Sequence, residues 1–76
     1  MNKARRKKLA AIYEKITELN ELLEEIKDEE EEALGNLPEN LTGSDKYQAM
    51  EEAVANMEEA MDNLGFAADS IEEAMA

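Results

Sequence analysis

A seven-residue phrase repeats through the last third of the chain and limits what the chain can fold into. Residues 51–75 read EEAVANM, EEAMDNL, GFAADSI and EEAM, with alanine at the third position of every copy. The fourth position is small or apolar, and the seventh is a large apolar residue. A repeat of this period forms an α-helix with one long contact seam. We therefore expect a helix over residues 44–75, with these core residues: Val54, Met57, Met61, Leu64 and Ile71.

Residues 3–34 show the same periodicity. Their apolar residues are spaced alternately three and four apart, which places them at the a and d positions of a heptad. Tyr13, Leu22 and Leu34 fall at e and g and widen the apolar stripe beyond a two-stranded seam. Glu30, inside an acidic run, takes an a position and interrupts the seam. The predicted core residues of this helix are Leu9, Ile12, Ile16, Leu19, Leu23 and Ile26.

Residues 35–43 contain the signals that separate the two helices. Gly35 and Asn36 predict a left-handed C-terminal stop, and Pro38 prevents the first helix from continuing. Ser44 is a good N-cap for the second helix. Because a short connection joins helices of similar length, the two are expected to be antiparallel neighbours.

The predicted fold class is all-α: one domain, residues 1–76, folded as an antiparallel helical hairpin of two long helices. Both apolar stripes are wider than one helix–helix contact covers. A column of alanines beside the second seam lets another helix approach closely. We therefore expect two hairpins to pair as a homodimer, forming a four-helix bundle. The alternatives are a monomeric hairpin and a hairpin completed by a different protein. The alanine column comprises Ala53, Ala60, Ala67 and Ala74.

The composition argues against catalysis and cofactor binding. The chain has no Cys and no His, so disulfides, thiol nucleophiles and the usual zinc ligand sets are absent. Ser44 and Ser70 have no evident base, and a small bundle has no room for a pocket, so we expect no enzyme. There is neither a calcium-loop motif nor the Glu-x-x-His pair of di-iron bundles, so we expect no metal and no cofactor.

Charge and hydropathy restrict the partners. The net charge of −12 disfavours direct binding to nucleic acid or to an anionic membrane. No apolar run approaches the ~20 residues of a membrane span, and the basic start is not followed by the apolar core of a signal peptide. The expected location is the cytoplasm, and the expected partner surface is basic.

Residues 24–32 hold seven carboxylates in nine positions. On a helix this is about one charge per 2 Å, close to the value of about one per 1.7 Å in duplex DNA. The run could therefore act as a DNA-mimicking surface for a basic nucleic-acid-binding protein, although acidic runs are more often solvated helix faces. The alternative is a solvated face that keeps the chain soluble. The predicted partner-binding residues are Glu24, Glu25, Asp28, Glu29, Glu31, Glu32 and Phe66.

Gly65 and Phe66 interrupt the repeat of the second helix. Gly65 predicts a kink or a tight helix crossing, because glycine costs about 1 kcal/mol against alanine inside a helix. Phe66 falls at the f position, away from the seam, where it is either an exposed anchor for a partner or a cover for a neighbouring chain.

A basic cluster opens the first helix: Lys3, Arg5, Arg6, Lys7 and Lys8. In an antiparallel hairpin this cluster lies at the same end as the acidic residues that close the chain. We therefore expect it to pair with them, and contact with nucleic acid or an acidic partner is the alternative. The acidic residues are Asp69, Glu72 and Glu73.

The opening MNKARRKKL, the central LPENL and the closing EEA units resemble a group of short, acidic, uncharacterised helical proteins of phages and mobile elements of Gram-positive bacteria. The resemblance carries over no catalytic residues. It implies phage-type roles, among them anti-CRISPR and other anti-defence inhibitors. The expected function is a non-enzymatic protein-binding module, an inhibitor that occupies a basic nucleic-acid-binding surface. The alternative is a structural coiled-coil module whose main role is self-association.

Overall fold

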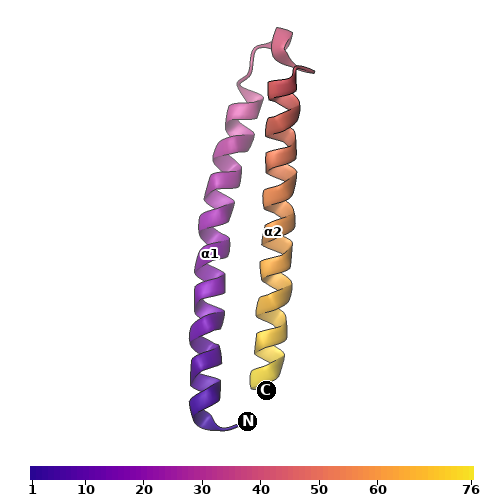
Figure 1. Cartoon of the computed structure of the whole chain (residues 1–76). Helices are drawn as coiled ribbons and strands as arrows, with labels where there is room; N and C mark the ends of the chain where they lie inside the picture. The colour runs from indigo at the N-terminus through magenta and orange to yellow at the C-terminus, as the bar shows by residue number, and fades with distance from the viewer.

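The computed structural model describes residues 1–76 as an antiparallel hairpin of two long helices (Figure 1). Helix α1 spans Lys3–Gly35, the short 3-10 turn η1 spans Glu39–Leu41, and α2 spans Asp45–Met75. The chain contains no strands, so the predicted all-α hairpin is confirmed. The molecule is a rod of 59 × 15 × 13 Å, with both termini at the end opposite the connection.

Each long helix begins at a polar cap. The side-chain oxygen of Asn2 accepts a hydrogen bond from the Arg5 N–H at 2.8 Å. The Ser44 hydroxyl accepts from the Tyr47 N–H at 3.2 Å and donates to the Leu41 carbonyl at 2.5 Å. First-turn N–H groups have no partner within their own helix, so these bonds fix where α1 and α2 start.

The end of α1 differs from the prediction. The helix includes Gly35, and Asn36 follows it with φ −96° and ψ 0°, so neither residue is left-handed. The Asn36 N–H instead donates to the carbonyls of Glu32 and Ala33 at 3.1 and 3.2 Å. This tightened last turn satisfies the carbonyls without a left-handed residue, and the predicted stop was wrong in its conformation. Gly43, with φ +87°, holds the one left-handed position, just before α2.

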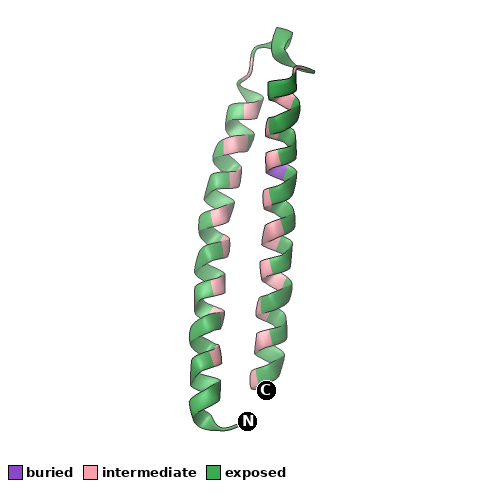
Figure 2. Cartoon of the chain, in the orientation of Figure 1, coloured by how far each residue is buried: buried purple, intermediate pink, exposed green.

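The hairpin has almost no interior. Val54 is its one buried residue, 8% exposed, and the other residues between the helices are half-buried (Figure 2). A compact protein of this mass exposes about 4,700 Å², whereas this chain of 8.5 kDa exposes 5777 Å². Its radius of gyration is 17.3 Å, against about 11 Å for a compact domain of the same length. The single hairpin therefore leaves uncovered a large area that a self-contained fold would bury.

Helix α2 turns its predicted seam toward α1. Every residue of that seam is buried or half-buried, in the three-four alternation read from the sequence. The alanine column is covered in part, with Ala53 and Ala60 half-buried and Ala67 and Ala74 exposed. The predicted core residues of α2 that lie in this seam are Val54, Met57, Met61, Leu64 and Ile71.

Helix α1 is rotated relative to its predicted seam. Its a residues Leu9, Ile16 and Leu23 are half-buried, as expected. The d residues are largely exposed: Ile12 at 45%, Leu19 at 55% and Ile26 at 54%. The e positions take their place, because a single neighbouring helix covers only two adjacent lines on α1 and here it covers a and e. The half-buried e residues are Tyr13, Asn20, Lys27 and Leu34.

Candidate interaction surfaces

Four large apolar side chains on α1 form an exposed line that we call the outer stripe: Ile12, Leu19, Leu22 and Ile26. All four are between 45% and 55% exposed. Their spacing places them on one face of the helix. Successive residues are about 100° apart around a helix axis. Each of the three d residues of the stripe immediately precedes an α2-facing e residue, so the stripe lies about a quarter-turn from the α2-facing line.

The α2-facing line of α1 is the more polar of the two. The Asn20 side-chain N–H donates to the Met61 carbonyl at 3.4 Å, and the Asn20 side-chain oxygen is buried without a partner. Lys27, with its side chain 17% exposed, and Glu30, half-buried, lie on the same side. Sequence reasoning missed this division because the three-four spacing fits both lines.

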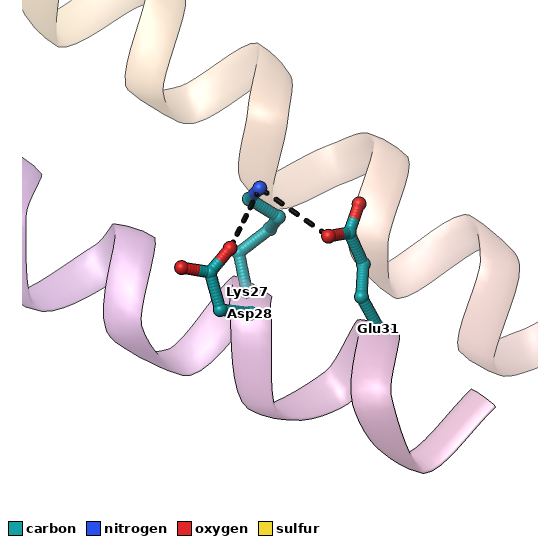
Figure 3. Close-up of polar contacts among 3 residues, drawn as sticks. All are labelled: Lys27, Asp28 and Glu31. Carbon is teal, nitrogen blue, oxygen red and sulfur yellow. Dashed lines mark hydrogen bonds and ion pairs between the residues drawn. The ribbon is translucent and has the colours of Figure 1, made fainter. Parts of the chain in front are cut away.

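The six carboxylates predicted to bind a partner all lie on the exposed surface of α1: Glu24, Glu25, Asp28, Glu29, Glu31 and Glu32. The side chain of Lys27 forms ion pairs with two of them (Figure 3). Its Nζ lies 2.9 Å from Asp28 Oδ1 and 3.5 Å from Glu31 Oε2. The hydrogen bond to Asp28, together with the negative charges of Asp28 and Glu31, raises the pKa of the Lys27 ammonium. Partial burial acts in the opposite direction. These are the structure's only ion pairs, so Glu24, Glu25, Glu29 and Glu32 have none.

The basic cluster at the start of α1 is exposed and lies at the same end of the rod as the C-terminus of α2 (Figure 1). The predicted pairing with the C-terminal acids does not form, since neither ion pair of the structure involves this cluster. Glu72 acts instead on Tyr13. Its hydrogen bond and negative charge raise the pKa of the Tyr13 hydroxyl, with smaller contributions from burial and Asp69.

Gly65 and Phe66 interrupt the repeat of α2 without ending the helix, which runs unbroken over Asp45–Met75. A Cβ placed on Gly65 would meet no atom within 4 Å, so the predicted tight crossing is not present in the hairpin. Phe66 is 68% exposed, the highest value among the large apolar residues.

The structure does not bring Phe66 together with the acidic run. The hydrogen bond between Asn20 and the Met61 carbonyl shows that these two residues lie side by side at the same position along the rod. Phe66 lies five residues beyond Met61 toward the free ends of the rod, whereas Glu24 lies four residues beyond Asn20 toward the connection. At 1.5 Å per residue, the two are separated by about 14 Å or more along the rod.

No group of three or more acidic side chains is arranged to hold a metal ion. The surface hollows are open, and each is lined by four residues. Neither helix has a stretch that is both long enough and apolar enough to cross a membrane.

Comparison with known proteins identifies no relative. No family model matches the chain, and no similar curated protein or solved structure was found. The outer stripe and the acidic run are therefore the two features from which a function is inferred.

Proposed function

We propose that this chain is a non-enzymatic interaction module whose main activity is self-association, in which two hairpins pair into a four-helix bundle. The observation that carries the proposal is the joint exposure of the four large side chains of the outer stripe. Contiguous apolar surface of this kind marks interaction sites on proteins. The quarter-turn between the stripe and the α2-facing line is the angle between the two neighbours that each helix has in such a bundle.

The exposed area supports the same proposal. The chain exposes 5777 Å², about 1,100 Å² more than a compact protein of its mass. A standard protein–protein interface buries about 800 Å² on each partner. The excess exposed area of one hairpin is therefore large enough to form its side of an interface along the length of the rod.

Leu19→Glu tests the proposal, because Leu19 is the middle residue of the outer stripe. We expect the wild-type chain to sediment at twice 8.5 kDa at high micromolar concentration and the variant to sediment as a monomer. Thr17→Glu is the matched control, because it adds the same charge at an exposed position of α1 outside the stripe. A wild-type chain that stays at 8.5 kDa at these concentrations would refute self-association.

A second function is favoured by a separate observation: four carboxylates of the acidic run are exposed and have no ion partner. We propose as the alternative that this surface occupies the basic nucleic-acid-binding site of a cytoplasmic protein and inhibits it, as anti-defence proteins of phages do. Binding of this type falls steeply as salt is raised.

Charge reversal separates this alternative from self-association. Capture of a partner from lysate is expected to be lost in the variant Glu29→Lys, Glu31→Lys, Glu32→Lys and kept in a control with the same reversals elsewhere on α1. The control substitutions are Glu14→Lys, Glu18→Lys and Glu21→Lys, all at exposed positions. Capture that survives reversal of the acidic run would refute the inhibitor mechanism.

A further inference from the structure

The charges of α1 are arranged about the centre of its outer stripe. Leu19 has Ile12 seven residues before it and Ile26 seven residues after it. Steps of seven residues from Ile12 and Ile26 reach Arg5 on the N-terminal side and Ala33 on the C-terminal side. Steps of seven from Leu22 reach Lys8, through Lys15, on the N-terminal side and Glu29 on the C-terminal side. This face of α1 is therefore apolar at its centre, basic at one end and acidic at the other.

We propose, building on the self-association above, that the second copy docks antiparallel, α1 against α1, about a two-fold axis at Leu19. An interface of this symmetry places each residue opposite its counterpart at equal distance from the axis. Ile12 then faces Ile26 of the second copy, and Leu19 faces Leu19. Lys8 lies beside Glu29 of the second copy, so each basic cluster meets an acidic run.

Other arrangements satisfy the charges or the apolar residues less well. In a parallel pair, Arg5, Lys8 and Glu29 would each face their own counterpart, and like charges placed together oppose association. An antiparallel pair shifted by one heptad places Ile12 opposite Ala33 or Ile26 opposite Arg5, so one isoleucine loses its large apolar neighbour. Lys15 is the one charged residue between Ile12 and Ile26 on the d and g lines that carry the stripe. In the Leu19-centred register its aliphatic stem lies over Leu22 of the second copy, with its ammonium in water.

Helix α2 offers a matching surface on the same side of the hairpin. Members of the outer stripe precede α2-facing residues by one position, and members of the alanine column likewise precede α1-facing residues. In two antiparallel right-handed helices, lines related in this way lie on the same side of the pair. The next line around α2 is uncharged, although α2 is otherwise acidic: Asn56, Asn63 and Ser70.

The outer stripe of α1 and the alanine column of α2 are also centred at the same position along the rod. Ala60 has an alanine seven residues to either side, as Leu19 has an isoleucine. The 3.4 Å contact between Asn20 and the carbonyl of Met61 places these two centres side by side. One two-fold axis therefore pairs α1 with α1 and the alanine column with the alanine column, which closes a four-helix bundle.

Cysteine cross-linking tests the register, since the chain has no cysteine of its own. A disulfide forms only between closely facing Cβ atoms. In a glutathione buffer, Leu19→Cys alone should give a covalent dimer. Ile12→Cys and Ile26→Cys should each stay monomeric on a denaturing gel and give a covalent dimer when mixed. An equal mixture of Thr17→Cys and Glu21→Cys is the control, because these exposed positions are equally spaced about Leu19 but lie off the stripe.

The charges give an independent readout. Arg5→Glu with Lys8→Glu should weaken dimerisation by about tenfold or more. Adding Glu29→Lys and Glu32→Lys to the same chain should restore it, because both ends are then reversed together. In a parallel pair the added reversals would restore nothing.

Failure of the register and failure of self-association are distinguishable. A covalent dimer from Ile12→Cys alone would show a parallel pair and overturn the register while self-association stands. Sedimentation as a dimer without any of the expected cross-links would do the same. Chains that neither cross-link nor sediment as dimers would overturn both proposals.

Discussion

The side of α1 that faces α2 mixes polar with apolar residues, whereas the side that carries the outer stripe exposes large apolar side chains to water. Asn20, Lys27 and Glu30 lie toward α2, whereas the outer stripe is exposed with four large apolar side chains. In a rod this thin, the contact between the helices stays partly wet, so Lys27 and Glu30 are only half-buried, whereas the side-chain oxygen of Asn20 is cut off from water. The outer stripe, whose burial would stabilise the protein most, is the line that a single chain leaves exposed to water.

Two adjacent leucines give the largest expected effect and test this comparison directly. Leu23 is half-buried against α2, and Leu22 is 55% exposed in the outer stripe. In dilute solution, Leu23→Ala should lower the free energy of unfolding by about 2–3 kcal/mol, and Leu22→Ala by less than about 1 kcal/mol.

The difference between the two variants should narrow as protein concentration rises, because the proposed dimer would bury Leu22 and couple unfolding to dissociation. Urea denaturation over a hundredfold range of protein concentration measures this. A Leu22→Ala effect that stays the same across the range would break the proposed role of the stripe.

Replacement of Asn20 tests the polar side of the comparison. Its side-chain oxygen is buried without a partner, and its one inter-helix hydrogen bond is long at 3.4 Å. Asn20→Leu should raise the free energy of unfolding by about 1–2 kcal/mol, because it removes an unsatisfied acceptor and adds apolar contact. Thermal denaturation measures the change, and a lower melting temperature would show that the Met61 contact contributes more than its length suggests.

Gly65 extends the comparison to α2. No atom lies within 4 Å of a Cβ at this position, so Gly65→Ala should stabilise the helix by about 1 kcal/mol. Gly65 lies on the side of the α2 seam opposite the alanine column, so the gain should not depend on protein concentration. Loss of stability only at high concentration would place a second chain against Gly65 and contradict the proposed packing.

The smallest effect concerns pH. The pKa of Tyr13 is raised from 10.0, first by its hydrogen bond to Glu72, and that of Lys27 is raised from 10.5, first by its hydrogen bond to Asp28. Stabilisation from both groups is therefore present below pH 10 and lost as pH rises through the raised values. Tyr13→Phe should make the decline above pH 10 shallower, as followed by circular dichroism. Tyr47→Phe, which removes the other phenol, is the control, and an equal change in both variants would contradict the role of Glu72.

The sequence was sufficient to predict the hairpin, the seam of α2 and the surface position of the acidic run, because each follows from local spacing or charge. The rotation of α1 was not predictable. Tyr13 and Leu34 on the e line compete with Ile12 and Ile26 on the d line, and only the position of α2 decides between them. The separation of Phe66 from the acidic run likewise depends on how the two helices align, which no local pattern specifies.

Val54, the one buried residue, has a consequence for the amount of this protein that a cell can keep. A chain with so little interior of its own gains stability by mass action when it associates. Proteases remove mainly unfolded molecules, so scarce copies are degraded faster than abundant ones. With the proposed self-association, the level of the folded protein would rise more steeply than its rate of synthesis, and weak expression would leave little folded protein in the cell.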